Sequence, residues 1–70
     1  MKRKDLIRRI AGRARAVNVD WVIKREGASH TVYSLGRLTI PIPRHTELGE
    51  KLVTEIFKEC AAELGEGWWK

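Results

Sequence analysis

Apolar residues recur every three or four positions in two segments, one near each end of the chain. In the first segment, from Lys4 to about Ala14, this spacing places the apolar side chains on one face of a helix and the arginines on the rest of its surface. The same spacing runs from Leu48 to Leu64, and Gly65 is a residue type that commonly ends a helix. We expect the second segment to be the main helix of the core, with Thr46 as its candidate N-cap, while Gly49 leaves the first residue of the helix open.

Between these two segments the apolar and polar residues alternate, which is the pattern of half-buried strands. The predicted strands are residues 17–24, 30–35 and 37–40. Turn-forming residues at 25–29 and at Gly36 separate the strands and are short enough to join antiparallel neighbours. Pro41 and Pro43 lack a backbone N–H, so they are expected to end the third strand.

This order of elements predicts an α+β fold, a small helix–three-stranded antiparallel sheet–helix domain with both helices on one face of the sheet. We expect one domain over residues 1–70, of which residues 65–70 form a C-terminal tail. A chain of 70 residues is near the lower limit for a self-sufficient core and has little room for a deep cavity. Its function is therefore expected on a surface or in a shallow groove, with a large partner.

The positive charge is concentrated in the first two thirds of the chain. Residues 1–45 contain eleven basic and three acidic side chains, whereas residues 46–70 contain three basic and six acidic ones. This asymmetry favours a polyanionic partner such as nucleic acid. The alternative is a net charge that serves only to keep a small protein in solution.

Cys60 is the only cysteine, which excludes an internal disulfide, and a single thiol does not make a zinc site. We expect no metal and no other cofactor. The apolar surroundings of Cys60 in a helical segment indicate a small buried hydrophobe rather than a nucleophile. The chain has no run of about 18 apolar residues, and Arg8 and Arg9 interrupt the apolar stretch that a signal peptide needs. We therefore expect a cytoplasmic protein.

Two histidines, His30 and His45, lie within the basic part of the chain. Histidine both accepts and donates protons near neutral pH, which suits it to acid–base catalysis. His30 follows a turn of small residues that lets a polynucleotide come close, and Gly27 is expected to supply backbone freedom there. His45 follows Pro43 and Arg44 and is a candidate second proton carrier. Either histidine can instead be structural: His30 as a solvent-facing strand residue, His45 by bonding its own loop.

Several polar residues around His30 are candidates for binding RNA phosphates. They are Lys24, Arg25, Arg37 on the neighbouring strand, and Arg44. Ser29 is expected to orient His30 or to donate to a phosphate oxygen. In RNA the 2′-hydroxyl already lies beside the phosphorus, so a base, an acid and nearby cations suffice for cleavage without a metal. The products are a cyclic phosphate and a 5′-hydroxyl, and DNA is expected to stay intact.

The aromatic residues have two interpretations each. Trp68 and Trp69 can stack on bases, but a terminal aromatic pair more often closes over the open edge of a small core, and we favour that interpretation. Tyr33 can reach the site of His30 or pack between the sheet and a helix.

The chain resembles the HicA family of bacterial toxin ribonucleases. The matching segments are the opening Lys4–Ile7, the small-residue turn from Gly27 to His30, the aromatic Tyr33, the sequence Ile42–Leu48 and the closing Gly65–Trp69. Together these segments span most of the chain, and their order is more specific than any one of them.

The resemblance implies a fold similar to double-stranded-RNA-binding domains, cleavage of messenger RNA, and a catalytic role for His30. Gly27 matches the family's glycine. The resemblance also implies neutralisation by a cognate HicB-like antitoxin that covers the site. We therefore expect a metal-independent endoribonuclease, the toxin half of a toxin–antitoxin pair. The alternatives are a non-catalytic double-stranded-RNA-binding module and a protein-interaction subunit whose basic helix docks on an acidic partner.

Overall fold

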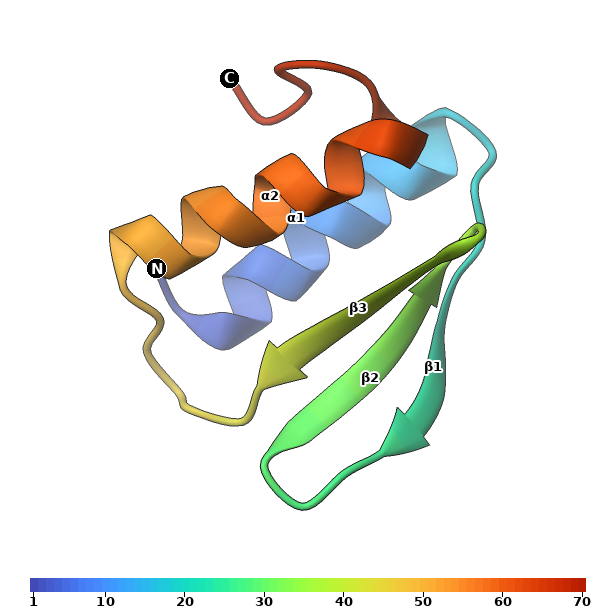
Figure 1. The fold of residues 1–70 in the computed structure, drawn as a ribbon. Helices are drawn as coiled ribbons and strands as arrows, with labels where there is room; N and C mark the ends of the chain where they lie inside the picture. Colours follow the sequence, from blue (N-terminus) through green and yellow to red (C-terminus); the bar gives the residue numbers. More distant parts are fainter.

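The computed structural model describes all residues from Met1 to Lys70. Along the chain, one helix precedes three consecutive strands and a second helix follows them. The elements are α1 (Arg3–Ala16), β1 (Trp21–Glu26), β2 (His30–Leu35), β3 (Leu38–Pro43) and α2 (Glu50–Leu64). The strands form one antiparallel sheet in the order β1–β2–β3, and both helices lie on the same face of it (Figure 1). This confirms the predicted α+β layout. None of its helices combines the length and the apolar character that crossing a bilayer requires.

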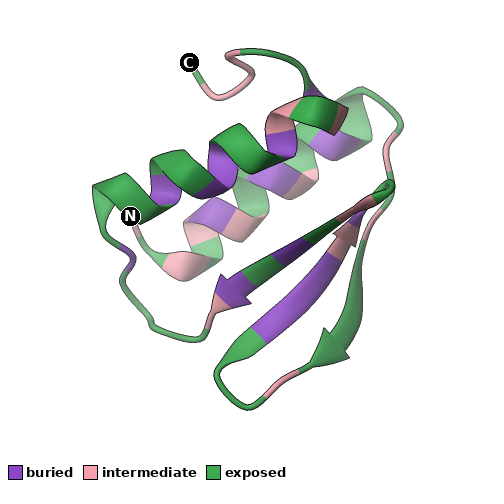
Figure 2. Cartoon of the chain, in the orientation of Figure 1, coloured by how far each residue is buried: buried purple, intermediate pink, exposed green.

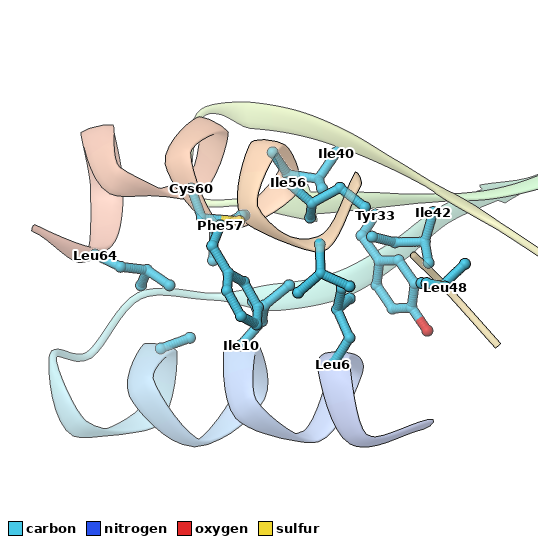
Figure 3. Packing of buried hydrophobic residues seen from close by; sticks show 13 residues of the cluster. Leu6, Ile10, Tyr33, Ile40, Ile42, Leu48, Ile56, Phe57, Cys60 and Leu64 are labelled. Carbon is cyan, nitrogen blue, oxygen red and sulfur yellow. The ribbon is translucent and has the colours of Figure 1, made fainter. Parts of the chain in front are cut away.

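The core lies between the sheet and the pair of helices. It contains the apolar stripe of each helix together with the inward-facing residues of β2 and β3, and Phe57 is its largest fully buried side chain. In Figure 3 the Phe57 ring extends from α2 into the space between the two helices. Figure 2 shows that the buried parts of both helices face inward, whereas β1 is exposed along most of its length. The helical spacing therefore predicted the correct faces, and the core covers β2 and β3 more fully than β1.

β3 differs from its prediction, because it continues through both prolines to Pro43 instead of ending before them. Pro41 and Pro43 both pair in register with residues of β2. β3 is an edge strand, so a proline nitrogen that points away from the sheet removes no hydrogen bond from it. The N–H of Arg44, at the alternate position, does point toward the sheet and donates to the Ser29 carbonyl at 3.2 Å. The prolines thus block the outer edge of β3 without interrupting its inner pairing.

β1 begins at Trp21, four residues later than predicted, because α1 continues to Ala16 and a turn follows it. Asn18 adopts a φ of 58° in this turn, and asparagine is among the few non-glycine residues that tolerate such values. β1 pairs only with β2, so its other edge is open. Val22 and Ile23 on this strand are 56% and 53% exposed. The β1 edge is therefore both apolar and unpaired.

α2 begins at Glu50 with Gly49 as its N-cap and no side-chain cap, so the expected cap at Thr46 is wrong. Thr46 instead lies in the loop that joins β3 to α2. Its carbonyl accepts a hydrogen bond from the Arg3 N–H at 2.9 Å, which ties this loop to the start of α1. Gly65 ends α2 as predicted, with a φ of 100° that disfavours other residues.

The C-terminal tail packs on α2. The indole N–H of Trp68 donates to the Phe57 carbonyl at 2.8 Å, and the two rings meet edge to face with centroids 4.8 Å apart. The Trp69 carbonyl accepts a hydrogen bond from Arg9 of α1 at 2.7 Å. The tryptophan pair therefore closes over the core, as the favoured interpretation predicted. Cys60 is fully buried nearby, as expected for a small hydrophobe.

Candidate functional site

His30 lies on the face of the sheet that is turned away from both helices. Tyr33 and Leu35 belong to the core beneath the helices, so the alternate residues of β2, His30, Val32 and Ser34, point to the opposite face. Val32 is buried although it lies outside the core cluster, and it lines a hollow on this outer face. The outer face of the sheet is therefore a separate surface with a small apolar floor.

A shallow hollow on this face surrounds the start of β2. Its lining consists of Arg25, Gly27, Ala28, Ser29, His30, Val32 and Pro41. His30 is exposed, and its imidazole makes neither a hydrogen bond nor an ion pair with the rest of the protein. Both ring nitrogens are therefore accessible to a molecule bound in the hollow and can exchange protons with it.

Two cations of β1 share this outer face because the strand contains a bulge. The register shifts between Ile23 and Arg25, so Lys24 is an extra residue in the pairing of β1 with β2. Arg25 pairs with Val32 and lines the hollow. The Lys24 ammonium donates to the Thr39 hydroxyl of β3 at 3.2 Å on the same face. Neither cation has a carboxylate partner. Arg25 lines the hollow of His30, whereas Lys24 does not, so a phosphate contact from Lys24 remains a prediction.

The turn before His30 depends on close approach of two backbone segments. The Gly27 N–H donates to the His30 carbonyl at 2.8 Å. A Cβ atom on residue 27 would lie only 3.1 Å from that same carbonyl oxygen. The expectation of an unusual backbone angle is wrong, because Gly27 does not have a positive φ. Glycine suits this position because a Cβ would make a tight contact that the His30 carbonyl must relieve by moving a few tenths of an ångström.

Arg44 holds this turn instead of pointing freely into solvent. Its Nε donates to the Gly27 carbonyl at 3.1 Å, and its Nη2 forms an ion pair with Glu26. Its backbone N–H also donates to Ser29. These contacts occupy much of the guanidinium that was predicted to bind phosphate. Arg44 therefore positions the segment that carries His30, and a phosphate contact from it remains a prediction.

A second part of this support was not predicted from the sequence. Thr31 is almost fully buried, at 3% exposed, on the helix-facing side of β2. Its hydroxyl accepts a hydrogen bond from Arg3 of α1 at 2.8 Å and donates to Glu26 of β1 at 3.0 Å. Since Glu26 also binds Arg44, four side chains from four segments are joined next to His30. A single threonine in an alternating strand carries no sequence signal for such a network.

Two predicted site residues do not join the hollow. Arg37 lies in the turn before β3, at the far end of β2 from His30, which is on the order of 16 Å away at ~3.3 Å per residue. The structure therefore corrects its expected place beside the scissile phosphate. His45 is exposed in the loop two residues beyond Pro43, the register partner of His30. No hydrogen bond joins the two imidazoles, so a catalytic role for His45 remains a prediction.

The other polar and aromatic candidates are also placed by the structure. Ser29 lines the hollow, but its hydroxyl makes no hydrogen bond to His30, so a role in orienting the imidazole is not seen. Tyr33 is in the core and stacks on Trp21 with ring centroids 4.1 Å apart. It lies on the opposite face of the sheet from His30. Burial, and to a smaller extent the charge of Glu59, raises the pKa of the Cys60 thiol to about 12, so Cys60 is not a nucleophile.

Comparison with known proteins finds no match to this chain among protein-family models, curated proteins or solved structures.

Proposed function

We propose that this protein is a metal-independent endoribonuclease that cleaves messenger RNA, with His30 as its catalytic proton carrier. The observation that supports this most directly is the exposed His30 imidazole, which has no protein partner and shares its hollow with the unpaired guanidinium of Arg25. The hollow is shallow and open on one face of the sheet, which suits a polymer better than a small enclosed ligand.

The proposed reaction uses the nucleophile that RNA itself provides. The 2′-oxygen forms a bond to phosphorus while the bond from phosphorus to the 5′-oxygen breaks, which yields a cyclic phosphate and a 5′-hydroxyl. A base accepts the 2′ proton, and an acid donates a proton to the departing oxygen. His30 performs one of these transfers, and His45 is the candidate for the other. Arg25 and Lys24 stabilise the negative charge that develops on the phosphate oxygens.

The resemblance to HicA toxins extends the proposal to a cellular role. On this basis we infer a fold of the double-stranded-RNA-binding type and a toxin that acts on messenger RNA in the cytoplasm. A HicB-like antitoxin would neutralise it by covering the hollow at His30. The free cations of the outer face give such an antitoxin an obvious electrostatic complement, because an acidic segment seated there would compete directly with RNA.

The test is cleavage of a labelled RNA by the purified protein in the presence of EDTA. We expect the wild-type protein to cleave RNA and to leave DNA of the same sequence intact. His30→Ala is expected to lower the rate by at least about 100-fold, the usual contribution of a positioned acid or base, while RNA binding is retained. Lys58→Ala, which removes an exposed cation of α2, serves as the control and should cleave like the wild type.

Each other outcome points to an alternative. Intact RNA together with equal binding by wild type and His30→Ala would contradict the enzyme and favour a non-catalytic double-stranded-RNA-binding module. A complete lack of RNA affinity at low salt would contradict both and favour a protein-interaction subunit. Comparing pH–rate profiles of wild type and His45→Ala assigns the second proton: loss of one limb of a two-limbed profile makes His45 the partner of His30.

A further inference from the structure

A second basic hollow lies at the start of α1, beside the turn that carries His30. It is lined by Lys2, Arg3, Lys4, Arg44 and Thr46, so four of its five residues are cationic and none is acidic or apolar. α1 and the loop after β3 build it together, and the hydrogen bond from the Arg3 N–H to the Thr46 carbonyl joins these two segments. We refer to it as the α1 hollow.

Most of the positive charge in the α1 hollow is not neutralised within the protein. Lys2 and Lys4 form no ion pair. The guanidinium of Arg3 donates only to neutral oxygens of neighbouring strands, both at 2.8 Å, and keeps further N–H groups free. Arg44 alone has a carboxylate partner, Glu26. Lys2, Arg3 and Lys4 thus lie together without counter-charges, which favours an anionic ligand.

We propose that the α1 hollow binds a backbone phosphate of the same RNA strand whose scissile phosphate lies at His30. The inference rests on the proposed function and adds a substrate subsite to it. The hollow concentrates cations at the first turn of α1, where the N–H of Lys4 has no protein acceptor and is available to a phosphate oxygen.

The geometry links the two hollows through the turn of residues 27–29. These residues line the hollow of His30. On the other side, Arg44 lines the α1 hollow and donates from Nε to the Gly27 carbonyl. A strand that crosses this turn therefore contacts both hollows. The α1 hollow offers charge but no apolar surface on which a base could stack. It therefore binds the phosphate without distinguishing the base.

The experiment compares two substrates and two matched double variants. Lys2→Ala/Lys4→Ala removes two cations from the α1 hollow. Arg15→Ala/Lys58→Ala removes two exposed cations elsewhere that form no ion pair. One substrate is a single-stranded RNA of about twenty nucleotides. The other is a dinucleoside monophosphate, whose only phosphate is the scissile one and which cannot occupy both hollows.

We expect Lys2→Ala/Lys4→Ala to raise KM for the long RNA about five-fold at 0.1 M salt with little change in kcat. One phosphate contact on a single strand contributes about 0.7 to the slope of log affinity against log salt concentration. The contribution to affinity vanishes near 1 M salt and amounts to a factor of about five at 0.1 M. Cleavage of the dinucleoside monophosphate should be unchanged. The control pair should leave the salt slope for the long RNA as it is in the wild type.

Binding measured in the His30→Ala background separates this inference from the proposed function. If no protein cleaves RNA, the proposed enzyme is refuted, and the salt slope of binding still tests the subsite. If Lys2→Ala/Lys4→Ala binds the long RNA with an unchanged salt slope, or if the control pair loses as much affinity, the α1 hollow is not a phosphate subsite. Thermal unfolding of each variant confirms that it is folded.

Discussion

The network around Thr31 leads to a prediction about how the site is held together. Thr31→Val keeps the shape of the side chain and removes only the hydroxyl that accepts from Arg3 and donates to Glu26. Hydrogen bonds to charged groups contribute about 1.5–3 kcal/mol each. Glu26 keeps its contact with Arg44 and is partly exposed, so water replaces part of what it loses. We therefore expect a loss of about 2 kcal/mol in the free energy of unfolding, which corresponds to a fall in Tm of about 10 °C for a chain of this size.

The assay is denaturant unfolding of Thr31→Val beside the control Thr39→Val. Thr39 is an exposed residue of β3 that accepts a single hydrogen bond from Lys24, so its change should stay within about 0.5 kcal/mol of the wild type. Thr31→Val should also cleave RNA more slowly, because Glu26 and Arg44 hold the turn before His30. A Thr31→Val protein as stable as the Thr39→Val protein would refute the idea that the buried hydroxyl anchors this end of the sheet.

Two further substitution and labelling experiments test the turn and the core. Gly27→Ala places a Cβ 3.1 Å from the His30 carbonyl and should lower stability and cleavage, whereas Gly12→Ala, which meets nothing within 4 Å in α1, should raise stability by about 1 kcal/mol in the same unfolding assay. Equal effects of the two substitutions would contradict the close-approach argument. Burial raises the pKa of Cys60 to about 12 from 9.0, so the folded protein should resist alkylation at pH 8, and mass spectrometry should detect labelling only after unfolding. Since the folded pKa is the higher one, this thiol destabilises the fold only as the pH rises above about 9. Rapid labelling of the native protein at pH 8 would show that Cys60 is accessible.

Features that repeat along the chain were predictable, and features that depend on pairing were not. The apolar spacing of α1 and α2 and the alternation at β2 are local patterns, so their types and faces were predicted correctly. The passage of β3 through Pro41 and Pro43 depends on its position at the sheet edge, which no local pattern reveals. The wrong candidate cap at Thr46 has a similar origin, because Thr46 is held by α1 and the helix begins after Gly49.

The candidate site was predicted in part for the same reason. His30 and Arg25 were expected to be neighbours and share one hollow. Arg37 was placed in the wrong part of the sheet, because antiparallel pairing around the turn at Gly36 puts the first residues after the turn beside Leu35, at the opposite end of β2 from His30. Arg25 reaches the outer face only through the bulge that pairs it with Val32, and the link from Arg3 to Thr31 joins α1 to β2 across 28 positions of the chain. Contacts of this kind exist only once the strands are in register.

The two edges of the sheet have unequal consequences for self-association. A filament built by strand addition needs two usable edges on every molecule, one for each neighbour. Pro41 and Pro43 offer no backbone N–H to a strand that would add to the edge of β3. The edge of β1 has no such block and exposes Val22 and Ile23. Strand pairing through β1 alone joins only two molecules, so the prolines of β3 disfavour open-ended fibres.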